Sequence, residues 1–410
     1  MLLEDYCYVL PRIQNFPEYD MKPNTEWFGI KSICYDGADY NGKKTKVFAH
    51  IGYPNIKGVE KVPAIVLVHG GGGHAFPEWI KIWNEKGFAA IAMDTTGFVP
   101  REDRKGLIGT EAYKMDGEYE KELYGDFKED GYVLGPYNSE MLDCDLPLGD
   151  QWMYHAVTAT ILAHNILLND ERIDSEKIGI CGISWGAVIT SIAIGYDTRY
   201  AFAIPVYGSG HLDYLPAPKL PTVFGEEKVK KLWSASDRFD RVTFPILWHC
   251  WAYDTAFSIG ANSQSYIDTK DSDSYLSISF DMGHSHKQAW DSKVCYRFAK
   301  KIIENKLPLI RVVNEPQGFG DISFKIQIPE DFCDVTAEIF YLNEPMKYDE
   351  NNNPRHKWQG IKAEINDDYV IGNIPDGTCC YFVELRGKVD DIEYISDTKV
   401  VFLQIENGVF

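Results

Sequence analysis

The sequence predicts an α/β domain with a mostly parallel central sheet, followed by a small all-β domain at the C-terminus. Apolar runs alternate with segments of helical spacing from Ala64 to about residue 303. This helical period vanishes after Pro308, where short alternating runs take over. The length of 410 residues also exceeds what one hydrophobic core usually organises. We therefore expect two domains, residues 1–309 and residues 310–410.

The first α/β repeat follows a stretch with strand-like alternation, residues 27–53. Residues 64–68 are continuously aliphatic or β-branched, and glycines occupy positions 70–73. Helical spacing then covers residues 77–86, and residues 89–93 form a second apolar run. A strand, a glycine loop, a helix and a strand make a βαβ unit. Strands that are apolar throughout belong to parallel sheets covered on both faces.

The stretch between residues 97 and 150 interrupts this alternation. It is acidic, rich in Gly and Tyr, and shows little periodicity. A connection of this length is unusual in a compact domain unless it is functional or disordered. We expect a lid-like or disordered insertion in the first domain.

The alternation then resumes up to the end of the first domain. Helices are predicted at residues 152–168 and 187–194, and strands at 177–181, 202–207, 244–250 and 275–280. A last helix places its apolar residues Val294, Phe298, Ala299, Ile302 and Ile303 on one face. Pro205 counts against residues 202–207 as a central strand, because proline cannot donate to the strand ladder.

The C-terminal residues 310–410 predict an immunoglobulin-like β-sandwich. Short alternating runs at 322–328, 336–341, 379–385 and 399–403 are separated by clusters of Pro, Gly, Asn and Asp. No set of nucleophile, base or metal ligand is visible in them. We interpret the domain as a packing module, or as one through which the chain forms a homo-oligomer. Trp358 and Tyr341 leave sugar binding open.

Composition excludes several classes of partner. The formal net charge of −20 and the pI near 4.9 disfavour nucleic acids and anionic membranes, which would repel the chain. The first eight residues carry acid where a secretion signal needs base, and no apolar run approaches the roughly 20 residues of a membrane span. The nine cysteines include no C-x-x-C pair, which is typical of reduced thiols. We expect a cytoplasmic protein.

The motif that carries chemistry is Gly182-Ile-Ser-Trp-Gly186, which matches G-x-S-x-G. It lies between a predicted strand and a predicted helix, the setting that a nucleophile elbow requires. The flanking glycines permit the tight turn that pushes the hydroxyl out of the sheet. Ser184 is therefore the predicted nucleophile, and the alternative is a serine that only caps the helix.

A serine hydroxyl needs a base that is oriented by a carboxylate, and in this setting the chain order is Ser, acid, His. Asp254 follows one predicted strand and His284 follows the next, so both fall where the order predicts. Two other carboxylates compete less well: Asp273 precedes the last strand, and Asp281 is close in sequence to His284. His286 remains an alternative to His284 as the base.

Glycines 70–73 supply the remaining requirement of acyl transfer. Negative charge develops on the carbonyl oxygen, and preorganised backbone N–H groups must stabilise it. We expect these donors to be Trp185 and either Gly71 or Gly72. His69 and His74 flank the glycines and are expected to fix the loop. The loop lacks a G-x-x-x-x-G-K frame, so phosphate binding is disfavoured.

Aromatic residues crowd the same segments, and three are candidates for substrate binding: Trp152, Trp251 and Trp290. Such rings can stack on a sugar face or wall a small acyl pocket. The competing interpretation is ordinary core packing. The pair His284 and His286 has no Cys beside it, so no metal site is predicted. We expect no cofactor.

These segments together resemble a known family. Val66–Gly73, Ile91–Asp94, Trp152–Val157, Gly182–Gly186, Pro205–Gly208 and Met282–His286 are similar to bacterial α/β-hydrolases described as acetyl xylan esterase-like or dienelactone hydrolase-like. The resemblance extends from about Trp27 to the end of the chain. It implies a triad of Ser184, Asp254 and His284, and removal of short acyl groups, often acetyl, from carbohydrates.

Three places depart from the family pattern. His74 replaces a small polar residue, Ala187 replaces a second glycine, and Cys250-Trp-Ala-Tyr253 stands where Asn-Gly-Thr-Asn is usual. The first two lie beside the glycine loop and the predicted elbow. These departures affect the shape of the pocket and leave the chemistry intact.

The predicted function is thus a serine esterase acting through an acyl-enzyme on a small-molecule or oligosaccharide ester. The nearest alternative is a serine peptidase for short peptides, because related folds perform both reactions. A different class is a non-catalytic glycan-binding protein. The residues do not distinguish among acyl lengths, alcohols or oligomeric states.

Overall fold

The computed structural model describes residues 1–20, 29–56, 58, 61–102, 119–120, 127–214, 225–351 and 353–403. The chain divides into two compact units. The first comprises Met1–Ala203 and Glu227–Trp233, and the second comprises Ile204–Glu226 and Ser234–Phe410. This division falls inside the predicted first domain, and the boundary at residue 309 stays a prediction. Of the predicted insertion at 97–150, residues 103–118 and 121–126 lie outside the described residues.

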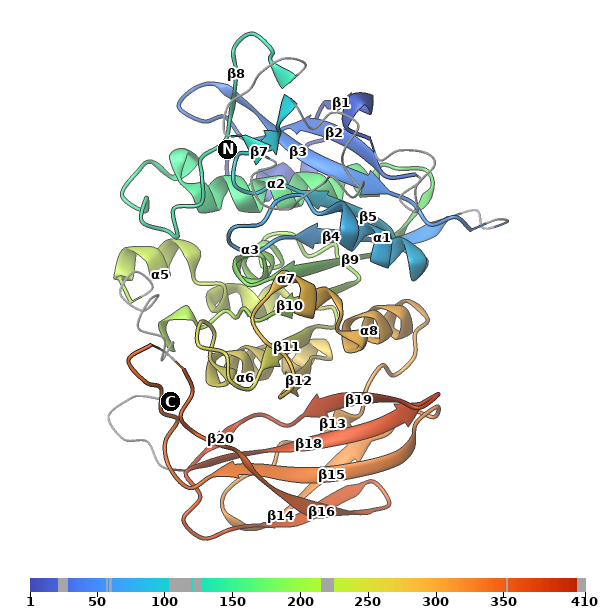
Figure 1. Ribbon diagram of the computed structural model, residues 1–410, viewed down its shortest axis with the longest axis vertical. Helices are drawn as coiled ribbons and strands as arrows, with labels where there is room; N and C mark the ends of the chain where they lie inside the picture. The colour runs from blue at the N-terminus through green and yellow to red at the C-terminus, as the bar shows by residue number, and fades with distance from the viewer. Residues whose placement is uncertain are drawn as a thin grey trace. The chain divides into compact units, whose positions relative to one another are not determined.

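The first unit contains a mixed sheet (Figure 1). Its strands are β1 (Ile13–Asn15), β2 (Lys31–Asp36), β3 (Lys44–Gly52), β5 (Ala89–Met93), β4 (Val62–Val68) and β9 (Ile173–Ile183), in that spatial order. The first three pairings, up to β3 with β5, are antiparallel, whereas β5, β4 and β9 run parallel. Val68 pairs with both Met93 and Gly182, so three parallel strands end at the same edge.

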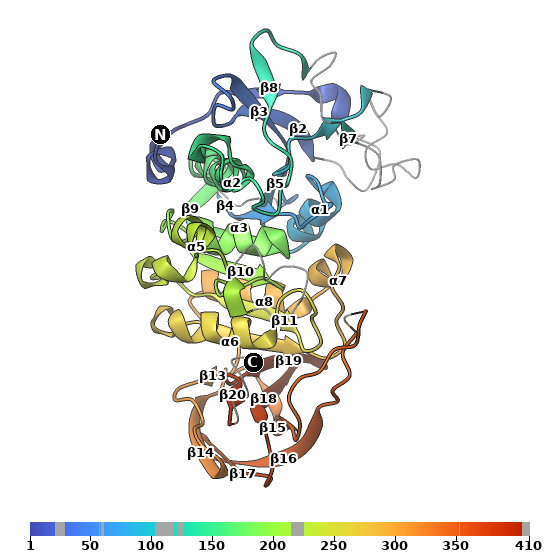
Figure 2. The same ribbon diagram turned by 90° about the vertical axis from the view of Figure 1, so that its left-hand side faces the viewer.

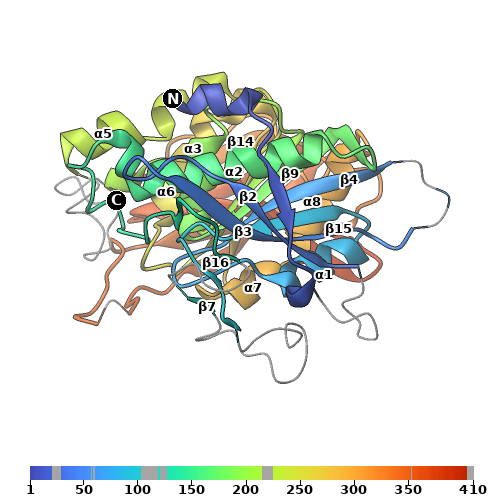
Figure 3. The ribbon, with the colours of Figure 1, turned by 90° about the horizontal axis from the view of Figure 1, so that it is seen from above.

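Helices cover both faces of this sheet. The helix α1 (Pro77–Glu85) lies on one face, and α2 (Trp152–Leu168) and α3 (Trp185–Ala193) lie on the other (Figures 2 and 3). Nearly every residue of α2 is buried, as expected of a helix that is apolar all round. The predicted boundaries of the α2 helix and of the β5 strand are confirmed to the residue.

Shorter elements complete the first unit. They are the strands β6 (Val99–Pro100), β7 (Tyr119–Glu120) and β8 (Tyr132–Leu134), the helix α5 (Glu227–Trp233), and the 3₁₀ turns η1 (Leu3–Tyr8), η2 (Pro17–Tyr19) and η5 (Leu148–Asp150). The strand β8 pairs in parallel with the start of β3. A part of the predicted insertion thereby extends the carboxyl edge of the sheet.

The second unit begins within β10 (Phe202–Val206), which pairs in parallel with β11 (Leu247–Trp251), and β11 with β12 (Tyr275–Ser279). Pro205 lies inside β10 and is accommodated there. The helices are α6 (Ile259–Asp268), α7 (His286–Trp290) and α8 (Lys293–Ile303), and the 3₁₀ turns are η6 (Leu212–Tyr214), η7 (Ser236–Arg241) and η8 (Lys270–Ser272).

The C-terminal strands of the second unit pair only in antiparallel fashion among the described residues. They are β13 (Arg311–Val312), β14 (Gly320–Gln327), β15 (Cys333–Leu342), β16 (Gln359–Asn366), β17 (Tyr369–Ile374), β18 (Cys380–Val389), β19 (Ile392–Asp397) and β20 (Val401–Phe402). They enclose their own apolar cluster, which includes Phe324, Ile339 and Val383. One residue pair, Leu276 with Asp397, joins β19 to β12.

Candidate functional site

Ser184 occupies a strained turn between β9 and α3. Its backbone has φ 56° and ψ −120°, outside the regions that residues with a side chain normally populate. Its side chain makes no capping hydrogen bond to α3. The alternative of a serine that only caps the helix therefore has no support in the geometry.

The two glycines of the motif are required by close backbone contacts. A Cβ atom on Gly182 would lie 2.1 Å from the carbonyl oxygen of Gly186. A Cβ atom on Gly186 would lie 2.1 Å from the carbonyl oxygen of Val68 and 2.5 Å from that of His69. The start of α3 thus packs directly on the end of β4, which holds Ser184 at the tip of the turn and beside the glycine loop.

The glycine loop after β4 is a tight turn closed by a hydrogen bond from the Gly73 N–H to the Gly70 carbonyl, 3.0 Å. Gly72 has φ 69°, which a residue without a side chain adopts at no cost. Gly71 and Gly72 are exposed. Among the described residues, neither of their N–H groups has a hydrogen-bond acceptor. They are therefore available to a ligand.

His69 fixes this loop, as the sequence predicts. The Thr95 N–H donates to His69 Nε2 at 3.0 Å, so the ring proton is on Nδ1, which donates to the Gly70 carbonyl at 2.8 Å. Beside it, Asp94 accepts from the N–H groups of Thr96 and Phe98, each at 2.9 Å. Burial raises the pKa of Asp94 to about 7, and those hydrogen bonds oppose the rise.

Trp152 has a different position from the one that substrate binding requires. It is fully buried, its indole N–H donates to the Thr95 carbonyl at 2.7 Å, and its ring meets Trp185 edge-on at 5.4 Å. Trp185 in turn lies against Gly71, where a Cβ atom would be 2.9 Å from its ring. We therefore correct the expectation for Trp152: it offers a ligand no exposed face and supports Trp185 instead.

The second unit holds a carboxylate and a histidine in direct contact. Asp254 is buried, and its Oδ2 is 2.7 Å from His284 Nδ1. Its Oδ1 accepts from the backbone N–H groups of Ala256 at 2.8 Å and Phe257 at 3.0 Å. A carboxylate that accepts from Nδ1 keeps the imidazole in the tautomer whose Nε2 can take a proton.

Two aromatic rings hold the imidazole of His284. The ring of Tyr207 lies 4.8 Å away, tilted by 32°, and that of Phe257 is stacked at 6.0 Å. Tyr207 is buried, has φ 51°, and its hydroxyl donates to the Ser285 carbonyl at 3.3 Å. Tyr207 was not predicted as a site residue. The signal that could have identified it is its position directly after a predicted strand, where a functional side chain is often placed.

The rival residues have other roles. His286 begins α7, and burial together with the proximity of His284 lowers its pKa to about 4. Asp273 pairs with Arg311 at 2.9 Å on the surface. Asp281 is exposed. The carboxylate contact thus falls on His284.

The other candidates for substrate binding lie in the second unit. Trp251 is half-buried and lies 6.3 Å from the ring of Tyr253. Trp290 is largely buried, and its carbonyl accepts from the Tyr296 hydroxyl. His249 is a satisfied buried histidine: its ring contacts the Ser277 carbonyl at 3.0 Å and the Ser292 hydroxyl at 2.9 Å. Of the two tryptophans, Trp251 is the one with enough exposed surface to contact a ligand.

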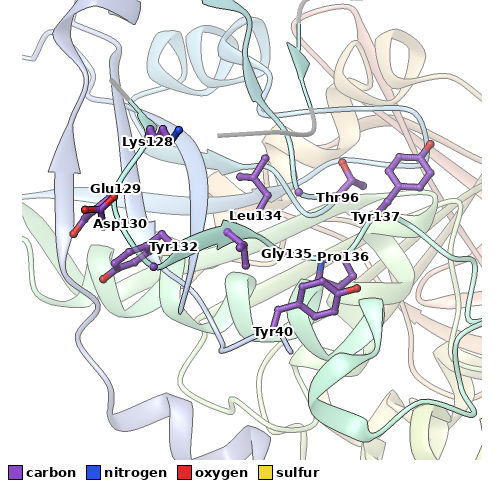
Figure 4. A pocket seen from close by; sticks show the side chains of 13 residues that line it. Tyr40, Thr96, Lys128, Glu129, Asp130, Tyr132, Leu134, Gly135, Pro136 and Tyr137 are labelled. Carbon is purple, nitrogen blue, oxygen red and sulfur yellow. The ribbon is translucent and has the colours of Figure 1, made fainter. Parts of the chain in front are cut away.

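A cavity of about 530 Å³ lies in the first unit beside the turn that follows β5. Tyr40, Thr96, Gly97 and residues 128–137 line it (Figure 4). Its size suits a small organic ligand. It is built mainly by the stretch that the sequence marks as an insertion, whose abundance of tyrosine was the available signal.

In the described part of the chain, no group of three or more His, Cys, Asp or Glu side chains could hold a metal ion. None of its helices has the length and apolar character needed to cross a membrane. The candidate residues lie in two units: Ser184 and the glycine loop in the first, and Asp254 with His284 in the second.

No family model and no curated protein matches this chain. Solved structures do. The acetyl xylan esterase from Paenibacillus sp. R4 is 16% identical with a TM-score of 0.47, over 73% of this chain and 90% of that one. Acetyl xylan esterase 1 from Thermoanaerobacterium sp. JW/SL YS485 is 14% identical with a TM-score of 0.46, over 73% and 93%.

An acylaminoacyl peptidase from Pyrococcus horikoshii is similar as well, with 17% identity and a TM-score of 0.46, over 71% of this chain and 43% of that one. At these identities and scores the likeness assigns no function. The residues of the chain itself must carry that assignment.

Proposed function

We propose that this chain is a serine esterase of the α/β-hydrolase type that removes short acyl groups, above all acetyl, from carbohydrates. The observation that carries the proposal is the backbone of Ser184, at φ 56° and ψ −120° between β9 and α3. Strain of this kind persists where function requires it. Here it sets a hydroxyl at the carboxyl edge of a sheet, beside a loop with unpaired N–H groups.

The proposed first step is attack of Ser184 Oγ on the ester carbonyl, while His284 Nε2 takes the hydroxyl proton. The carbonyl oxygen becomes negative and accepts from the N–H groups of Trp185 and Gly71 or Gly72. His284 then returns the proton to the leaving alcohol as the bond to carbon breaks. Asp254 stabilises the imidazolium through its 2.7 Å contact with Nδ1.

The second step repeats the chemistry with water. His284 removes a proton from water, the hydroxide attacks the acyl carbon, and Ser184 leaves with that proton, which releases the acid. These steps need only the side chains and backbone groups named above. The substrate proposed is a neutral small molecule or oligosaccharide ester, in keeping with a net charge of −20 that repels anionic polymers.

The test is hydrolysis of aryl esters of rising acyl length, acetyl to octanoyl, with acetylated xylo-oligosaccharides alongside and Ser184→Ala as the control. Activity confined to acetyl and lost in the variant supports the proposal. Preference for longer chains moves the substrate away from sugars. Turnover of aryl amides identifies a peptidase, and failure of the wild type to react with a serine-directed phosphonate identifies a non-catalytic binding protein.

A further inference from the structure

A third unpaired donor lies beside the glycine loop, on the segment that precedes α2. A Cβ atom placed on Gly71 would be 3.9 Å from the side-chain nitrogen of Asn138, Nδ2. Within the described ranges, Nδ2 has no hydrogen-bond acceptor, and the N–H groups of Gly71 and Gly72 have none either. These exposed or half-buried amide donors are therefore all available to one ligand acceptor.

The orientation of the Asn138 amide is determined by its other end. Its Oδ1 accepts from the backbone N–H of Glu140 at 2.8 Å. A backbone N–H can only donate, so the atom that faces it is the oxygen and the opposite atom is the nitrogen. The NH₂ group is thereby directed away from its own turn, and the glycine loop lies on that side.

The turn that carries Asn138 is held rigidly. Glu140 and Met141 have φ 53° and 66°, two successive residues with side chains in the left-handed region. Met141 is fully buried, and the α2 helix begins with the Trp152 N–H donating to Asp143 at 2.6 Å. A strained turn that is anchored by a buried residue and is followed by a hydrogen bond to the start of α2 restricts the position of its side chains, which is what preorganised catalysis requires.

We infer that Asn138 is a further catalytic residue: its side-chain N–H donates to the ester carbonyl oxygen as that oxygen becomes negative, beside the N–H of Gly71. The inference rests on the proposed function, because it needs an oxyanion at this loop. An asparagine that bridges two parts of a fold uses both its oxygen and its nitrogen on protein partners. Here only the oxygen is used in that way.

Two variants test the role of Asn138. Asn138→Ala removes the donor, and Asn138→Asp keeps the bond from Glu140 while replacing the NH₂ group by an oxygen of nearly the same size. Loss of one oxyanion donor lowers kcat about 10²- to 10³-fold. We expect this loss in both variants with KM on aryl acetate nearly unchanged, and an equal loss of affinity for a small alkylboronic acid, which forms a tetrahedral anion on serine.

The matched control is Ser139→Ala, the next residue of the same turn, whose buried hydroxyl has no partner among the described residues. It should keep the wild-type kcat. Folding of each variant is checked by circular dichroism, and Asn138→Asp keeps the turn-forming contact if Asn138→Ala does not fold.

A folded Asn138→Asp enzyme with kcat within threefold of wild type overturns the inference. So does a rise in KM at unchanged kcat, which would place Asn138 on the alcohol rather than on the carbonyl oxygen. Activity that survives in Ser184→Ala refutes the proposed function itself. Loss in Ser184→Ala with normal Asn138 variants refutes only the role of Asn138.

Discussion

The hydrogen bonds of Asp254 allow its charge to be removed without disturbing its packing. In Asp254→Asn, the amide oxygen can still accept from Ala256 at 2.8 Å and Phe257 at 3.0 Å, as Oδ1 does now. The amide NH₂ then faces His284 Nδ1, at the present contact of 2.7 Å, and can only donate. The imidazole must carry its proton on Nε2, so it cannot act as the base.

We expect this wrong tautomer to lower kcat by about 10⁴-fold, the size of effect seen when a triad carboxylate is replaced by its amide. The unfolding free energy should change by about 1 kcal/mol or less, because the asparagine keeps the contacts with Ala256, Phe257 and His284. The assay is hydrolysis of an aryl acetate at pH 7, with urea denaturation of the same samples. Asp273→Asn, at an exposed carboxylate paired with Arg311, is the matched control.

Turnover of Asp254→Asn within tenfold of wild type would refute the reasoning. A loss of activity that accompanies a loss of stability would show that Asp254 acts by packing rather than by orienting the base. A large loss in the Asp273→Asn control would mean that charge anywhere in this unit affects the assay.

Three further predictions concern stability. Gly186→Ala places a methyl group 2.1 Å from a backbone oxygen and should lower the unfolding free energy by about 3 kcal/mol or more in urea titration, whereas Gly149→Ala, which meets nothing within 4 Å, should stay near wild type. The pKa of Asp94 is higher in the folded state, about 7 against 3.8, so its contribution to stability is complete below pH 4 and is lost as pH rises through 7. Between pH 4 and pH 8, Asp94 should lower the unfolding free energy of the wild type by on the order of 4 kcal/mol, and Asp94→Asn should remove this difference. Urea titrations at the two pH values measure it, and the same pH dependence in the wild type and the variant would contradict the prediction. Asp397 lies across from Glu384 on the neighbouring strand, and burial together with the charge of Glu384 raises the pKa of Asp397. Asp397→Asn should therefore raise the melting temperature at pH 8 more than at pH 5. An equal rise at both pH values would count against this explanation by charge.

Local pattern was sufficient for the elements whose cause is local. The apolar run at residues 89–93 and the apolar helical segment at 152–168 predict β5 and α2 to the residue, because continuous burial requires an apolar residue at nearly every position of such segments. The glycines around Ser184 likewise predict the strained turn. The strands β16 and β17 were not predicted. The positions of β16 are exposed or half-buried, and β17 buries only Val370 and Ile374, between which Gly372 and Asn373 interrupt the apolar run. Their partners, not their composition, make them strands.

A candidate nucleophile could be named from the G-x-S-x-G motif, and candidates for the acid and the histidine loop from chain order, because in this kind of sheet the order is constrained by topology. The choice between His284 and His286 could not, since two residues in one loop have the same sequence context. The 2.7 Å contact with Asp254 favours His284. The burial of Trp152 and the approach of Asn138 to Gly71 could not be predicted either. They depend on segments distant in the chain, which only the packed structure brings together.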